Sequence, residues 1–164
     1  MCIAALAFAA HPRWALVVAA NRDEFHARPA LPLARWADAP QIIAGRDAEA
    51  GGTWLGVNET TARLVLVTNR RTGQPPQADA PSRGALVRAL LGGADPLAEP
   101  LAGYNPCNLL VADPAGLVAL ESYPAEHRRT LPPGVHGVSN GALDEAWPKT
   151  RALVAALADW LDHP

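Results

Sequence analysis

The stretch AANRDEF (residues 19–25) joins an apolar segment to four consecutive hydrogen-bonding residues, and it decides how the first part of the chain is interpreted. The apolar runs 2–9 and 14–20 lie on either side of a polar, proline-containing break. Short apolar runs separated by such a break are typical of paired, well-buried β-strands. This pairing would bring Cys2, at the start of the first run, close to residues 21–24 at the end of the second.

The composition is that of one globular domain. The 164 residues are 49% hydrophobic and 18% charged, which excludes a disordered tail or a charged coiled coil. The formal net charge is −2 and the basic residues are scattered, so the chain lacks the electrostatic character of a nucleic-acid-binding protein. The first apolar run is too short for a membrane span and lacks the basic start of a signal peptide. We therefore expect a cytoplasmic protein.

Cysteine and histidine usage predicts neither a metal site nor a cofactor. The two cysteines, Cys2 and Cys107, form no CxxC pair, and the five histidines have no ligand spacing. Cys107 opens an apolar run and is expected in the core. His136 lies between Val135 and Gly137 in a predicted strand, where a structural role is favoured over haem or metal ligation.

Strands and helices cluster along the chain instead of alternating, which predicts an α+β fold with layered sheets. The elements expected after the first two strands are a Pro- and Arg-rich loop (21–41), a hairpin (51–57 and 62–69) around residues 58–61, a helix capped by Ser82, a short helix (96–102), two strands around a turn at 113–116, a strand (135–140) and a closing helix from Trp147 and Pro148. The Gly51-Gly52 pair permits a backbone turn that a side chain would block.

Cys2 is the first candidate for chemistry. Removal of Met1, which a small second residue permits, would leave a thiol and a free α-amine on the same residue. The amine, whose ordinary pKa is about 8, can accept the thiol proton, so one residue would supply both nucleophile and base. The alternative is that Cys2 is a small hydrophobic residue of an edge strand.

Asp23 and two asparagines are the further candidates. The Asp23 carboxylate could orient the ammonium group of Cys2, or residues 21–24 could form a charged surface turn. Asn69 and Asn140 each end a predicted strand, where a side-chain amide can donate a hydrogen bond to a developing oxyanion. The alternative for each asparagine is that it starts a turn.

Six motifs together resemble the NRDE-motif family, which is named after transport and Golgi organisation protein 2. In chain order they are MCIA, AANRDEFHARP, IIAGRDAEAGGTWLGV, TNRR, PSRG and GVSN…WPK. That family is in turn similar to N-terminal-nucleophile hydrolases of the choloylglycine hydrolase and penicillin V acylase group. The resemblance implies that residues 1–164 form one domain, an αββα sandwich of antiparallel sheets with a processed N-terminal cysteine.

The resemblance also implies roles for individual residues. Cys2 would attack a carbonyl carbon, Asp23 would orient the α-amine, and Asn69 and Asn140 would stabilise the oxyanion. Those amidases carry an arginine three residues before the aspartate, at the place of Ala20 in this chain. Arg22 would replace that arginine if the backbone bends after the strand.

Three functions are left open by the sequence. The first is hydrolysis of the amide bond of a small acylated compound, and the second is non-catalytic binding and transfer of a hydrophobic ligand such as haem or an acyl lipid. The third is an inactive, truncated paralogue, because family members usually continue beyond the last helix, whereas this chain ends at Pro164. The sandwich would then be incomplete at the C-terminus, with a sheet edge left exposed or covered by a second copy of the chain.

Overall fold

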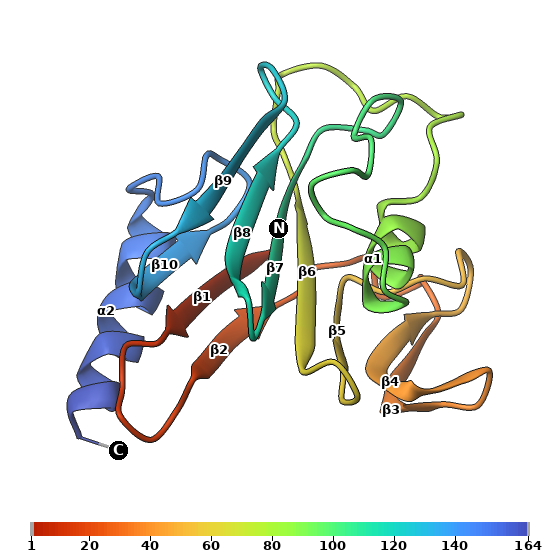
Figure 1. The fold of residues 1–164 in the computed structure, drawn as a ribbon. Helices are drawn as coiled ribbons and strands as arrows, with labels where there is room; N and C mark the ends of the chain where they lie inside the picture. Colours follow the sequence, from red (N-terminus) through yellow and green to blue (C-terminus); the bar gives the residue numbers. More distant parts are fainter. Residues whose placement is uncertain (1, 164) are drawn as a thin grey trace.

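The computed structural model describes residues 2–163, whose strands form two antiparallel sheets (Figure 1). The smaller sheet has the order β10-β1-β2 and consists of β1 (Ile3–Phe8), β2 (Leu16–Asn21) and β10 (Gly134–Val138). The larger sheet follows chain order from β3 to β9 and consists of β3 (Ala30–Trp36), β4 (Ala39–Asp47), β5 (Leu55–Asn58), β6 (Arg63–Asn69), β7 (Cys107–Asp113), β8 (Gly116–Glu121) and β9 (His127–Leu131).

Two helices cover the outer faces of the sheets. Helix α2 (Pro148–Asp162) packs on β1 and β10 of the smaller sheet, and helix α1 (Arg83–Leu91) packs on β5 and β6 of the larger sheet (Figure 1). A third apolar layer lies between the sheets and joins Leu6 of β1 to Leu66 and Leu110 of the larger sheet. The layers therefore run helix, sheet, sheet, helix, and the α+β prediction is confirmed.

Strand β1 is buried on both faces because of its alternating small and larger apolar side chains. Ala4 and Leu6 belong to the layer between the two sheets, whereas Ala5 and Ala7 pack against Leu157 of α2. Side chains of successive strand residues point to opposite faces, so a central strand covered on both sides must be apolar throughout. This explains why residues 3–8 carry no polar side chain.

The helix starts were predicted correctly. Ser82 caps α1, and its hydroxyl oxygen accepts a hydrogen bond from the Gly84 N–H at 3.2 Å. Pro148 is the first residue of α2, a position at which proline needs no hydrogen-bond donor. Leu157 and Leu161 of α2 are buried, whereas Trp160 is 44% exposed.

The predicted loop over residues 21–41 was wrong, because this segment contains β3 and the start of β4. Strand β3 pairs only with β4 and forms an edge of the larger sheet, where proline is tolerated. The register of the pair shifts between Leu31 and Ala34, the interval that contains Pro32. A second shift follows between Arg35 and Trp36. An irregular edge strand has neither the alternation nor the apolar run by which strands are recognised in a sequence.

The short helix predicted over residues 96–102 was also wrong. The structure has a turn there, in which the N–H groups of Ala98 and Glu99 both donate to the Asp95 carbonyl. Pro100 has no N–H donor and disfavours helical geometry at Glu99, so the helix cannot continue. Strand β9 was not anticipated, because its polar sequence HRRTL is largely exposed at the other edge of the larger sheet.

None of the helices between residues 2 and 163 has the length and apolar character needed to cross a membrane.

Candidate active site

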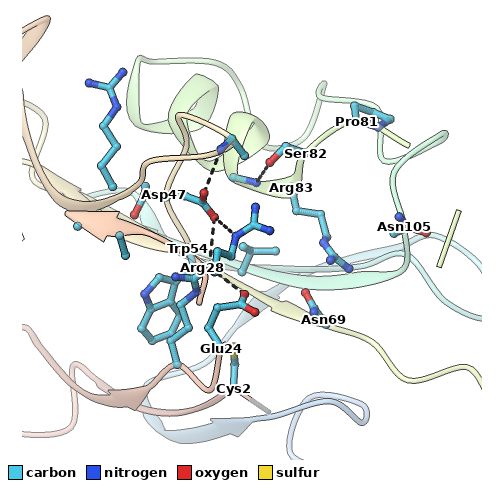
Figure 2. A pocket seen from close by; sticks show the side chains of 18 of the residues that line it. Cys2, Glu24, Arg28, Asp47, Trp54, Asn69, Pro81, Ser82, Arg83 and Asn105 are labelled. Carbon is cyan, nitrogen blue, oxygen red and sulfur yellow. Dashed lines mark hydrogen bonds and ion pairs between the residues drawn. The ribbon is translucent and has the colours of Figure 1, made fainter. Parts of the chain in front are cut away.

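The pairing of β1 with β2 places the predicted nucleophile beside the NRDE motif. Ile3 is opposite Asn21 at the end of the ladder, so Cys2 lies just before β1 while Arg22 and Asp23 follow β2. These residues line a cavity of about 390 Å³ between the ends of the strands and the start of α1 (Figure 2). The sequence therefore correctly indicated that the two segments meet.

Cys2 is partly buried and held by contacts on both sides. The Ser139 hydroxyl, just beyond β10, donates to the Cys2 carbonyl oxygen at 2.9 Å. Burial raises the pKa of the Cys2 thiol, and a hydrogen bond from the Asp23 backbone N–H together with the charge of Arg22 partly opposes this rise. The Asp23 backbone thus stabilises the thiolate, which is the reactive form of a cysteine.

Residues 21–24 form a local network of hydrogen bonds, and all of them except Arg22 are exposed at the surface. The Asn21 amide donates to the Asp23 carboxylate at 2.6 Å. The Arg22 guanidinium contacts the carboxylates of Glu24 at 3.0 Å and Asp47 at 3.2 Å. The chain leaves the ladder after Asn21, and both Arg22 and Asp23 line the cavity.

The two predicted oxyanion donors lie side by side but differ in their relation to the cavity. Asn69, the last residue of β6, is among the lining residues. Asn140 is buried just behind it, and its side-chain amide donates to the Asn69 backbone carbonyl at 2.7 Å. Its side-chain oxygen is buried and has no hydrogen-bond partner among the described residues. Asn140 therefore contacts the site through Asn69, and its role stays a prediction.

Asp47 organises a wall of the cavity that the sequence analysis missed. Its carboxylate accepts hydrogen bonds from Arg28 at 2.7 Å, from Arg22, and from the N–H groups of Glu49 and Ala50. Burial disfavours the charged form, but these hydrogen bonds outweigh it, so the pKa of Asp47 lies below its ordinary value. The AGRD motif quoted above was the available signal, although nothing in the sequence alone assigned it a role.

Arg83, the first residue of α1, was also missed. Its guanidinium extends from the start of the helix toward Asn69, across the cavity from Cys2 (Figure 2). The helix can reach this position because Gly52 and Gly84 touch through their backbones. A Cβ atom on Gly52 would lie 2.4 Å from the Gly84 carbonyl carbon, which is well inside any real contact. The PSRG motif was the only signal for this arginine.

Comparison with known proteins assigns the family. The model of the family described as Transport and Golgi organisation 2 (TANGO2) matches residues 1–164. The chain belongs to this family. A mouse homologue of transport and Golgi organization 2 is 36% identical over 169 residues, and the human homologue is 34% identical over 170 residues. The Drosophila melanogaster protein of that name is 39% identical over 84 residues, which covers 49% of this chain and 30% of the relative.

The chain spans only part of the length of the relatives that it matches. The matches to the mouse and human proteins cover 91% of this chain but 60% of each relative. Met1, whose removal a free Cys2 amine requires, lies outside the described residues, as does Pro164.

His136 is not among the residues that line the cavity around Cys2. Both ring nitrogens of His136 have partners, because Nδ1 contacts the Asp144 carboxylate at 3.0 Å and Nε2 contacts the Pro132 carbonyl oxygen at 2.9 Å. Between residues 2 and 163, no three side chains of His, Cys, Asp and Glu are grouped as metal ligands would be. The structural role that the sequence favoured for His136 agrees with these contacts.

Proposed function

We propose that this TANGO2 domain is an amidohydrolase that uses Cys2, freed by removal of Met1, to cleave small acylated compounds. The observation that carries the proposal is the cavity shared by Cys2, Asp23 and Asn69, which come from three separate segments of the chain. The layer order helix, sheet, sheet, helix supports it, because the resemblance to N-terminal-nucleophile hydrolases implies the same order.

The chemistry divides between two steps. The Cys2 thiol gives its proton to the α-amine, and the sulfur attacks the amide carbonyl carbon. A C–S bond forms and the carbonyl electron pair moves onto oxygen, to which the Asn69 amide would donate a hydrogen bond. The C–N bond then breaks, and the departing nitrogen takes a proton from the Cys2 ammonium group. Water, deprotonated by the same amine, hydrolyses the thioester and regenerates the thiol. Asp23 holds the amine in position throughout.

The test of this proposal is acyl transfer to Cys2. Purified protein whose intact mass shows the loss of Met1 is treated with p-nitrophenyl octanoate, and the acylated residue is mapped by mass spectrometry. We expect a burst of nitrophenolate and an octanoyl group on Cys2. The burst is absent in Cys2→Ala and is retained in Cys107→Ala, which removes the other thiol. Acylation of Cys107 alone, or of neither cysteine, contradicts the proposal.

Non-catalytic binding of an acyl lipid is a second candidate, and one observation favours it. Phe25, Leu31 and Leu33 are 83%, 56% and 73% exposed, and Leu31 also lines the cavity. Exposed apolar side chains beside a cavity can hold a hydrocarbon chain. Under this reading the Cys2→Ala variant binds a fluorescent fatty acid as tightly as wild type, and wild type shows no burst. Reduced binding in Leu33→Ser with a normal burst would assign these side chains to substrate binding instead.

A further inference from the structure

We propose that Arg83 binds an anionic group, a carboxylate or a phosphate, that the substrate carries next to its scissile carbonyl. This inference rests on the proposed hydrolase function, because it names the class of substrate taken by the same site. The substrates would be acylated compounds whose charged group follows the amide within one or two bonds, as in an N-acyl amino acid.

More positive than negative side chains line the cavity, and Arg83 is the arginine that has no carboxylate partner among the described residues. Four arginines line the cavity against three carboxylates. Three of the arginines are in ion pairs: Arg22 with Glu24 and Asp47, Arg28 with Asp47 and Glu49, and Arg46 with Asp38. Within residues 2–163, no carboxylate lies within the 4.0 Å of an ion pair from Arg83. Among the residues that the structure describes, the Arg83 side chain makes one hydrogen bond, a long contact to the Pro106 carbonyl oxygen at 3.4 Å.

The surroundings of Arg83 favour an incoming anion further. Arg83 opens α1, whose first turn holds no acidic side chain, so the positive end of the helix dipole faces the cavity uncompensated. Partial burial disfavours the cation and lowers the pKa of Arg83, and the nearby sulfurs and Glu24 only partly offset this. A bound carboxylate or phosphate would supply the missing negative charge through two parallel hydrogen bonds, which the planar guanidinium fits well.

The position of Arg83 determines where an anion bound to it would lie relative to the Cys2 sulfur. Figure 2 shows the Arg83 side chain extending from the start of α1 toward Asn69, and both residues line the cavity that contains Cys2. A substrate anchored there would present a carbonyl to Cys2 only if its charge lay close to that carbonyl. Arg83 is therefore a specificity-determining residue for compounds with a neighbouring charge.

Two alkylating agents of almost equal size test this without knowledge of the substrate. Iodoacetate is anionic and iodoacetamide is neutral. With both, the Cys2 thiolate attacks the CH₂ carbon, an S–C bond forms and iodide leaves with the C–I electron pair. The ratio of the two Cys2 alkylation rates, measured by peptide mass spectrometry, reports on recognition of the carboxylate. We expect Arg83→Gln to lower the iodoacetate-to-iodoacetamide ratio about tenfold, since a charge-assisted hydrogen bond is lost.

Matched variants isolate the effect of position. Arg88→Gln removes an equal charge from the same helix, but Arg88 is paired with Asp38 and does not line the cavity. We expect this variant to keep the wild-type ratio and Arg83→Lys to restore part of it. An unchanged ratio in both Arg83→Gln and Arg83→Lys, or an equal fall in Arg88→Gln, overturns the proposal. Thermal melts of the variants confirm that each is folded.

Competing anions identify the chemistry of the bound group. At constant ionic strength, slower alkylation of wild type by iodoacetate in the presence of inorganic phosphate supports a phosphate, and slowing by acetate supports a carboxylate. The absence of slowing by either overturns the proposal. Alkylation of Cys2 does not require turnover, so the two proposals fail separately. If Cys2 is octanoylated but Arg83→Gln does not change the alkylation ratio, only the anion-binding inference is contradicted. If Arg83→Gln changes the ratio but no acyl transfer occurs, only the proposed hydrolase activity is contradicted.

Discussion

Cys2 and Cys107 have similar places in the chain and very different places in the molecule. Cys2 directly precedes β1 and Cys107 opens β7. Burial raises the pKa of both thiols, and the charge of an arginine, Arg22 for Cys2 and Arg83 for Cys107, partly opposes the rise. Cys2 lines the cavity, whereas Cys107 is fully buried among the apolar side chains between α1 and the larger sheet. What separates a candidate nucleophile from a core residue is therefore access to a cavity, not strand position or a nearby cation.

The largest expected difference is in reactivity. We expect N-ethylmaleimide to modify Cys2 at least about 1,000 times faster than Cys107 in the folded protein, because Cys107 becomes accessible only through rare opening of the core. Peptide mass spectrometry after timed quenching measures both rates. In concentrated guanidinium chloride the two rates should converge, which controls for sequence effects. Comparable rates under native conditions would show that the core around Cys107 is open.

For stability, substitution in the core should have the larger effect and substitution at Cys2 the smaller one. Leu110 is buried between the two sheets, so we expect Leu110→Ala to lower the free energy of unfolding by about 2–5 kcal/mol. Cys2→Ala removes one partly exposed sulfur and should cost less than about 1 kcal/mol. Urea unfolding monitored by circular dichroism measures both changes. A large loss of stability in Cys2→Ala would assign this residue to the core as well.

Substitution of Asp47 tests whether its ion pairs with Arg22 and Arg28 contribute to the stability of the fold. We expect Asp47→Asn to lower the free energy of unfolding at pH 7 by about 1–3 kcal/mol, because the arginine contacts lose their charge. The pKa of Asp47 is depressed by folding, so its contribution is complete above the unfolded-state value and is lost as the pH falls below about 4. The difference between wild type and variant should therefore shrink in acid, as urea midpoints between pH 3 and pH 7 will show.

The smallest expected effect concerns the titration of Cys2. In protein that retains Met1, the rate of Cys2 alkylation by iodoacetamide should keep rising beyond the ordinary thiol pKa, because burial raises the pKa of this thiol. At pH 8 the folded protein should consequently react a few times more slowly than the denatured chain, since a smaller fraction of the thiol is ionised. A rate that levels off below the midpoint of free cysteine would mean that Arg22 and the Asp23 N–H outweigh burial.

The parts of the fold that could be predicted are those whose burial leaves a pattern in the sequence. Strands β1 and β7 are covered on both faces and read as apolar runs, and α1 has a recognisable cap in Ser82. Strands β3 and β9 form the two edges of the larger sheet and expose most of their side chains, so no period distinguishes them from loops. The helix predicted around Pro100 does not form, because this proline has no N–H donor and disfavours helical geometry at Glu99.

The candidate site divides in the same way. Cys2 and Asp23 could be paired in advance because adjacent antiparallel strands bring their ends together. Arg83 and Asp47 could not, because each reaches the cavity through a long-range approach of separate elements that no local pattern encodes. Asn140 shows a further limit: its strand-end position was predicted, but its amide donates to the Asn69 backbone, which only the packing of the two sheets determines.

The contact between Gly52 and Gly84 has a consequence for how selectivity can be altered. This contact sets how closely the start of α1 approaches residue 52, and Arg83 directly precedes Gly84 in the helix. A change at the contact would therefore move the Arg83 side chain. A methyl group added at Gly84 would meet Thr53 at 3.1 Å, a mild wedge compared with the severe one at Gly52. Substitution of a residue that never meets a ligand can therefore shift the distance between cation and sulfur, and so retune which compounds are chosen.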